Sequence, residues 1–149
     1  MLVQAHVSID GSAAAIWAAI TDIENAASST RGIEKIEILE RPVDGLVGLK
    51  WRETRILFGK PASADKWITR AVENESFETR AESDGFVFVT STRIEPGSDG
   101  MRLISTHDSR PQTFGTRIMA IPMALFFKGV ARKAILADLD DIKSAVEKR

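Results

Sequence analysis

The sequence has no cysteine among its 149 residues and only two histidines, His6 and His107. The lack of cysteine excludes disulfide bonds, thiolate metal sites and a cysteine nucleophile, so a zinc site would need carboxylates to complete it. Common catalytic signatures are missing as well, including G-x-S-x-G, the P-loop, the dinucleotide-binding fingerprint and H-E-x-x-H. We therefore expect neither a bound metal nor a cofactor.

Long hydrophobic runs are also missing. In the apolar stretch GTRIMAIPMALFFKGVARKA, uncharged residues extend only from Ile118 to Phe127, ten in all, and Pro122 interrupts them. A helix that spans a membrane needs about 20 consecutive apolar residues. The N-terminal MLVQAHVSID has no basic start, no continuous apolar segment and no small-residue cleavage site. We expect no integral membrane contact and a cytoplasmic location.

Neither sign of charge dominates, because the sequence has 20 Lys and Arg residues and 21 Asp and Glu residues, which gives a net charge of −1. This balance gives no electrostatic reason to expect a nucleic-acid partner. Hydrophobic residues make up 44% of the chain and charged residues 28%, which is ordinary for a globular protein. We expect one domain over residues 1–149, as a monomer or a homodimer.

The first part of the chain predicts a strand and then a helix. VQAHVSI alternates apolar and polar residues, which predicts a strand with one buried face and places His6 in solvent. DGSAAAIWAAITDIENAAS follows, with Ser12 as the N-cap of a helix. Trp17, Ile20 and Ile23 form a narrow apolar stripe along it.

Six strand-like runs follow at spacings of roughly ten residues, separated by short Gly, Asp, Asn and Pro turns. One run ends at Gly59 and Pro61, and the next begins at Asp65. A long helix is expected from Thr113 to Glu147. With the first strand, the pattern predicts an α+β fold with a seven-stranded antiparallel sheet and a short helical segment between strands 1 and 2.

This element order, together with the pieces IW…ITD, GLKWRETR…FGK and a further Trp67, resembles the SRPBCC superfamily, also called START-like. The polyketide cyclase/dehydrase-like branch is the most similar. The resemblance implies a helix-grip fold, in which the sheet wraps around the long C-terminal helix and encloses an apolar cavity. It also implies that Met119, Met123, Phe126 and Phe127 face that cavity, although such residues at helical spacing are more often ordinary core.

Alternation along GLKWRETRIL places Leu49, Trp51, Glu53, Arg55 and Leu57 on the inward face. A charge in an apolar concavity is costly unless it is paired. Glu53 and Arg55 therefore pair with each other or with groups on neighbouring strands. They either anchor a polar atom of a ligand or form a structural salt bridge at the cavity rim, and both interpretations stay open.

The later strands add further candidates. Met101, Leu103, Ser105 and His107 share a face, and we place His107 in the cavity as an acid–base candidate or as a hydrogen-bonded structural residue. Phe86, Phe88, Thr90, Thr92 and Ile94 form a second inward face. Trp67, Thr69 and Ala71 complement them. Together with Trp51, the two indoles suit a flat or long apolar molecule.

Three functions remain open. The first is binding, and possibly transport, of a hydrophobic small molecule such as a lipid or an aromatic polyketide, with Trp51, Arg55, Trp67, Phe88, Thr90 and the four apolar residues of the last helix as contacts. The second is a cyclase or dehydratase, a lyase-like enzyme acting on a polyketide, with His107, Glu53 and Arg55 as catalytic candidates. The third is a module that binds protein partners and has a filled interior. For the first, we expect a cavity of roughly 300–1,000 Å³.

Overall fold

A computed structural model describes residues 1–83, 85–112 and 114–148, and for residues 114–127 it describes the backbone alone. Seven strands form one antiparallel sheet in the order β1-β7-β6-β5-β4-β3-β2. The strands are β1 (Leu2–Ile9), β2 (Ile33–Glu40), β3 (Lys50–Leu57), β4 (Lys60–Val72), β5 (Ser76–Ser83), β6 (Phe86–Gly97) and β7 (Gly100–Pro111). The helices are α1 (Ala13–Thr21), the 3-10 turn η1 (Ile23–Asn25), α2 (Ala26–Ser29) and α3 (Phe114–Glu147).

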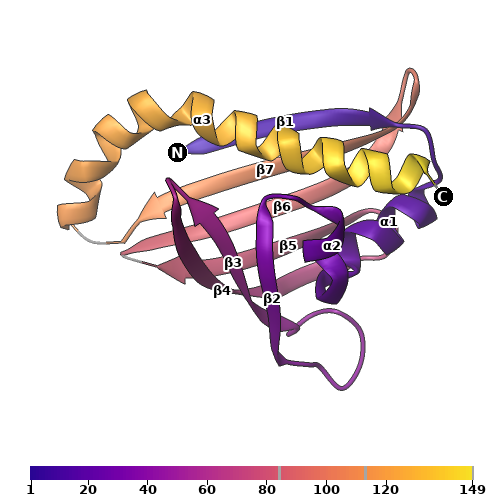
Figure 1. The fold of residues 1–149 in the computed structure, drawn as a ribbon, viewed down its shortest axis with the longest axis horizontal. Coiled ribbons are helices and arrows are strands. Elements are labelled where there is room, and N and C mark those ends of the chain that lie inside the picture. Colours follow the sequence, from indigo (N-terminus) through magenta and orange to yellow (C-terminus); the bar gives the residue numbers. More distant parts are fainter. Residues whose placement is uncertain (84, 113, 149) are drawn as a thin grey trace.

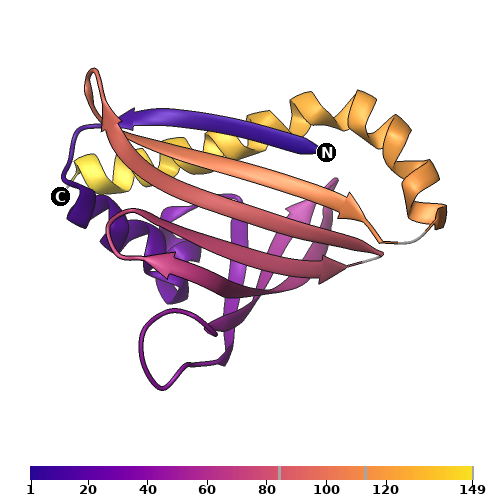
Figure 2. The ribbon, with the colours of Figure 1, turned by 180° about the vertical axis from the view of Figure 1, so that it is seen from behind.

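The long helix α3 crosses the concave face of the sheet, and α1 and α2 close one end of the same face (Figure 1). Viewed from behind, the opposite face of the sheet is turned outward, with the helices behind it (Figure 2). This arrangement is the predicted helix-grip fold, and the prediction of a seven-stranded antiparallel sheet is confirmed. None of the helices, over the residues that the structure describes, is long and apolar enough to cross a membrane.

The short helical segment forms as the sequence predicts. The Ser12 side chain accepts a hydrogen bond from the backbone N–H of Ala15 at 3.0 Å and so caps the first turn of α1. Trp17, Ile20 and Ile23 are all buried in the core, where the indole of Trp17 meets the ring of Phe77 edge to face at 6.1 Å. The segment therefore packs its apolar stripe against the concave side of the sheet.

Two strand boundaries differ from the prediction. β3 ends at Leu57 rather than at Gly59 and Pro61, and β4 begins at Lys60 rather than at Asp65. Phe58 and Gly59 both have positive φ values, 52° and 79°, and Leu57 pairs directly with Lys60 across them. A two-residue turn of this kind matches the twist of a β-hairpin and returns the chain to the sheet at once. Pro61 is tolerated because it stands at the start of the strand, where a missing N–H is least costly.

Side chains of α3 fix its C-terminal half to the loop before β2 and to the backbone of β1. Asp141 accepts hydrogen bonds from the backbone N–H and the Nε of Arg31, at 2.9 and 3.1 Å. Farther along, Lys143 donates to the backbone oxygen of Ser8 at 2.7 Å. The apolar stripe of this half is buried at Ile135, Leu139 and Val146, as the spacing predicts. These contacts fix the position of the C-terminal half of α3 over the sheet.

Candidate functional site

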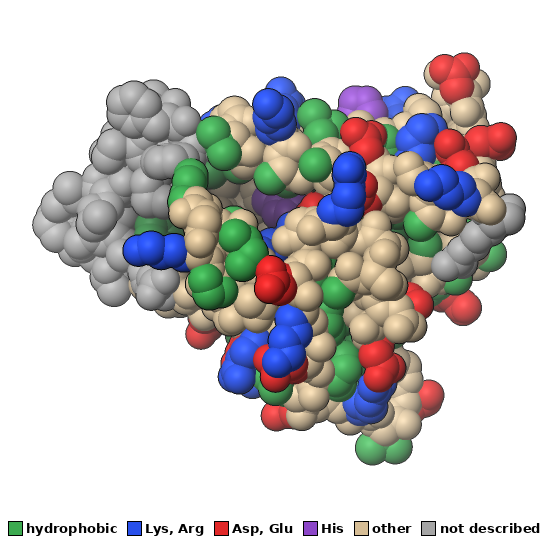
Figure 3. All heavy atoms as spheres, viewed as in Figure 1, with side chains coloured by type: hydrophobic (Ala, Val, Ile, Leu, Met, Phe, Trp, Pro, Cys, Tyr) green, Lys and Arg blue, Asp and Glu red, His purple; other side chains and the backbone are tan. Residues whose placement is uncertain are grey.

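A pocket lies between the C-terminal half of α3, the concave face of the sheet, and the segment from α1 to the start of β2. Its volume is about 150 Å³, smaller than the range that the sequence suggested. Figure 3 shows it as a hollow beneath α3 with a histidine side chain at its base. An apolar cavity of about this volume is large enough to take up one benzene ring.

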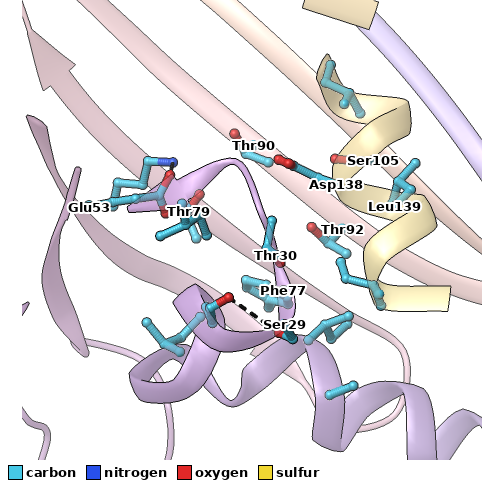
Figure 4. Close-up of a pocket in the computed structure, with 18 of the residues that line it drawn as sticks. Ser29, Thr30, Glu53, Phe77, Thr79, Thr90, Thr92, Ser105, Asp138 and Leu139 are labelled. Atoms are coloured by element: carbon cyan, nitrogen blue, oxygen red, sulfur yellow. Dashed lines mark hydrogen bonds and ion pairs between the residues drawn. The ribbon is translucent and has the colours of Figure 1, made fainter. Parts of the chain in front are cut away.

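The wall of the pocket is apolar toward the helices and polar toward the sheet. Its larger apolar side chains are Ile20, Ile23, Ile33, Trp51, Phe77, Ile135, Leu139 and Ile142. Its polar side chains, apart from Ser29 and Thr30, are Glu53, Arg55, Lys66, Thr79, Thr90, Thr92, Ser105, His107 and Asp138. Figure 4 shows threonines projecting from the sheet toward α3, with Asp138 and Leu139 projecting from the helix.

Four charged side chains form one network at the sheet side of the pocket. Glu53 is 8% exposed and accepts hydrogen bonds from Arg55 Nε at 2.8 Å and Lys66 Nζ at 2.9 Å. The same arginine reaches across to α3, where its two terminal nitrogens lie 3.2 and 3.0 Å from the two carboxylate oxygens of Asp138. Two acids and two bases thus compensate each other, and the arginine joins the sheet to the helix.

The network keeps Glu53 ionised. Burial by itself raises the pKa of this carboxyl, but the charges and hydrogen bonds of Lys66 and Arg55 outweigh burial and lower the pKa to about 2. For Arg55, burial lowers the pKa, while the contacts with Asp138 and Glu53 raise it above the ordinary value. Both groups are therefore locked in their charged forms near neutral pH.

His107 lies beside this network and between two hydroxyls. Its Nε2 is 2.9 Å from Ser105 Oγ, and its Nδ1 is 3.5 Å from Thr90 Oγ1. The register of β6 and β7 explains the contacts, because Thr90 is the direct cross-strand partner of His107. Burial and the positive charges of Lys66 and Arg55 lower the pKa of the imidazole to about 4, so the ring is neutral at pH 7.

Two threonine hydroxyls face the open space of the pocket. Thr79 and Thr92 are 7% and 9% exposed, and within the described residues neither side chain has a hydrogen-bond partner. Every fully enclosed side-chain oxygen or nitrogen of the described residues does have a partner. The hydroxyls of Thr79 and Thr92 are therefore reached from the pocket, and a molecule inside it can satisfy them.

Five of the residues proposed as ligand contacts or catalytic candidates line this pocket, namely Trp51, Glu53, Arg55, Thr90 and His107. Their roles in binding or catalysis remain predictions. Met119, Met123, Phe126 and Phe127 lie outside the residues whose side chains the structure describes.

Trp67 lies on the other face of the sheet, which corrects its predicted place in the pocket. Lys50 is its cross-strand partner and sits over its ring at 5.8 Å from the centroid, whereas Lys66 pairs with the inward Trp51. The indole thus contacts the ammonium group of a half-buried lysine on the face opposite the pocket.

Phe88 shares the inward face of β6 with Thr90 but lies toward the start of the strand, and it is not among the described residues that line the pocket. It is 38% exposed and stacks on Phe86, with ring centroids 6.1 Å apart. The strand is longer than the pocket, so its first inward residues extend past the pocket wall.

Sequence reasoning missed Lys66 and Asp138. The alternation on β4 contained a signal, because choosing buried Ile68 as the inward residue also turns Lys66 inward. Asp138 stands three residues after Ile135 and one before Leu139, so it shares their face of α3. A carboxylate on a buried helical face indicates a paired charge.

The sequence from residue 9 to residue 137 matches the family model described as polyketide cyclase / dehydrase and lipid transport. The chain belongs to this family. The SRPBCC and START-like resemblance is confirmed. A comparison of the sequence with curated proteins gives no match.

Three solved structures of this fold illustrate the likeness. An aromatase/cyclase, Zhui from Streptomyces sp. R1128, has a TM-score of 0.81 and 18% identity over 100% of this chain and 94% of its own. A START superfamily protein from Mycobacterium smegmatis has a TM-score of 0.77 and 20% identity over 99% and 97%. The protein TTHA0849 from Thermus thermophilus has a TM-score of 0.80 and 13% identity over 99% and 98%. At these identities, the likeness shows a common fold.

Proposed function

We propose that the protein binds a small molecule with an apolar ring in the pocket beneath the C-terminal half of α3. The observation that carries this proposal is the pair of hydroxyls on Thr79 and Thr92, which face open space and have no partner within the described residues. Because these hydroxyls are reached from the pocket, an oxygen of a bound molecule can pair with them, at about 0.5–1.5 kcal/mol for each hydrogen bond. The apolar wall then holds the body of the ligand.

Three further considerations support binding of a small ring. A volume of about 150 Å³ suits one ring better than a long acyl chain enclosed along its length. The family description names polyketide cyclases, dehydrases and lipid transport, and a neighbour of the same fold is an aromatase/cyclase. The pocket also disfavours the third interpretation, a partner-binding module with a filled interior.

Binding is tested with 4-methylphenol, a one-ring probe, by following backbone amide shifts of isotopically labelled protein in a titration. Replacing Thr92 with phenylalanine places a ring in the pocket between Phe77 and Ser105, its cross-strand neighbours, and is expected to weaken binding at least tenfold. Thr106→Phe is the matched control, because Thr106 lies on the outer face opposite Ser91 and Gln4. Equal affinities of the two variants would place the binding site elsewhere.

The cyclase or dehydratase alternative has weaker support from the chemistry of the site. A general acid or base works best when its pKa is near the working pH, whereas Glu53 has a pKa of about 2 and His107 of about 4. We expect His107→Gln to change any turnover of a linear poly-β-carbonyl compound less than tenfold, measured by chromatography of the products. A loss of about 10²–10⁴-fold would instead identify His107 as a catalytic acid or base.

A further inference from the structure

We propose that the pocket selects uncharged ligands that carry a hydroxyl or carbonyl oxygen, with Ser105 and Thr90 as the specificity-determining residues and His107 as the residue that orients them. This inference rests on the proposed function and adds the chemical class of the ligand. It depends on two separate features of the pocket wall, the compensated charges and the hydroxyl pair of Ser105 and Thr90.

The charged network leaves no cation for an anionic ligand. Lys66 and Arg55 both contact Glu53, and the remaining face of the arginine is bound to Asp138 by a bidentate pair. A carboxylate that enters the pocket would lose its hydration and would have to compete with Glu53 for Lys66 or with Asp138 for Arg55. Arg55 therefore joins the helix to the sheet, and its hydrogen-bond donors are occupied by Glu53 and Asp138 rather than open to the acid group of a ligand.

The hydroxyl pair gives the pocket hydrogen-bonding groups of defined direction. A neutral imidazole has one N–H and one bare nitrogen, so one of its two hydroxyl partners must accept and the other must donate. The hydroxyl that accepts from the ring keeps its own proton for a ligand oxygen. The hydroxyl that donates to the ring keeps lone pairs for a ligand O–H. Ser105 and Thr90, at 2.9 and 3.5 Å from the two ring nitrogens, thus present a donor and an acceptor, one at each nitrogen of the ring.

Neighbouring groups extend this polar surface. In the strand register, Thr92 on β6 lies opposite Ser105 on β7, and Thr79 on β5 lies opposite Thr90 on β6. All four hydroxyls line the same pocket. A ligand oxygen can therefore bind to more than one uncharged group, while its ring contacts Leu139 and Ile135 on α3. An oxygen-free hydrocarbon would supply none of these groups with a hydrogen bond and would leave Thr79 and Thr92 without a partner among the described residues.

The test compares three one-ring probes of similar size: 4-methylphenol, p-xylene and the anion 4-methylbenzoate. Dissociation constants come from amide-shift titrations at pH 7. We expect 4-methylphenol to bind about tenfold more tightly than p-xylene, as one or two added hydrogen bonds imply, and 4-methylbenzoate to bind at least tenfold more weakly than 4-methylphenol.

Variants then assign this preference to the hydroxyl pair. Ser105→Ala combined with Thr90→Val should reduce the preference for 4-methylphenol over p-xylene, because only the hydroxyls of Thr79 and Thr92 then remain, whereas Thr90→Ser, which keeps a hydroxyl, should preserve the preference. Ser91→Ala combined with Thr106→Val is the matched control, since these two residues pair with each other on the outer face. The ratio of two affinities is the readout, so a change in overall stability does not imitate the effect.

Several results would overturn the inference. If 4-methylbenzoate binds as tightly as 4-methylphenol, the charged network does not exclude anions. Should the preference for 4-methylphenol survive undiminished in the double variant, the two hydroxyls do not determine specificity. Equal binding of p-xylene and 4-methylphenol to the unaltered protein would leave the proposed binding function standing and refute the selectivity. Binding of none of the three probes would refute both.

Discussion

Lowering the pH from 7 to 2 is expected to remove about 6 kcal/mol of folding stability, in two separate steps. The upper step belongs to His107, whose pKa falls from 6.5 to about 4 on folding. Because the unfolded chain takes up this proton first, stability is complete above pH 6.5 and about 3 kcal/mol is lost as the pH falls to 4. Chemical denaturation at a series of pH values measures the loss.

The lower step belongs to Glu53, whose pKa falls from 4.5 to about 2 on folding. This carboxylate stabilises the fold fully above pH 4.5, and about 3 kcal/mol is lost as the pH falls through 2. A total of about 6 kcal/mol is comparable with the whole stability of many domains, so acid unfolding is expected within this range.

The two steps are separated with a pair of histidine variants. His107→Gln cannot gain a proton and should remove the loss of stability between pH 6.5 and 4. His6→Gln, which alters an exposed side chain on β1, is the matched control. A flat profile of the unaltered protein between pH 6.5 and 4 would show that the imidazole is neither buried nor held near cations as described.

Replacing Glu53 with leucine is expected to lower the free energy of unfolding by about 3 kcal/mol at pH 7. The substitution leaves Lys66 without its carboxylate partner and Arg55 with Asp138 alone, and both cations are less than one third exposed. Removing one member of a buried ion pair is costly because the other charge stays desolvated and unmatched. Urea denaturation, with the slope compared between variants, gives the difference.

Glu82→Leu is the matched control for this prediction. Glu82 is also a β-strand glutamate that pairs with an arginine two residues away, Arg80, at 2.9 Å, but these two side chains are 49% and 40% exposed. An exposed pair contributes at most about 1 kcal/mol. Similar losses for the two variants would mean that the buried network stabilises the protein no more than a surface pair does.

The sequence was sufficient to predict the fold because local signals and the global arrangement agree. The alternation of Trp51, Glu53 and Arg55 on β3, the cap at Ser12 and the turn residues between strands all indicate the same sheet. The boundaries at Leu57 and Lys60 were misplaced because Pro61 looked like a break. The tight turn at Phe58 and Gly59 instead brings that proline into the ladder.

The candidate site was predictable only in part, because it is assembled by register and by long-range contact. Whether Lys66 or Trp67 turns inward depends on how β3 pairs with β4, and hydrophobicity alone favours the wrong residue. The contact between Arg55 and Asp138 joins residues 83 positions apart and requires the position of α3 over the sheet. A local sequence pattern does not predict a contact between residues so far apart in the chain.

Intermolecular NOEs between 4-methylphenol and methyl-labelled protein test the central claim most directly, because they show where a ring lies. The account predicts contacts from the ring to the methyl groups of Thr92, Ile135 and Leu139, which line the pocket from the sheet and from α3. It predicts none to Thr106 on the outer face. NOEs confined to the outer face around Trp67, or saturable binding without any contact to these three methyl-bearing residues, would contradict the assignment of this pocket as the binding site.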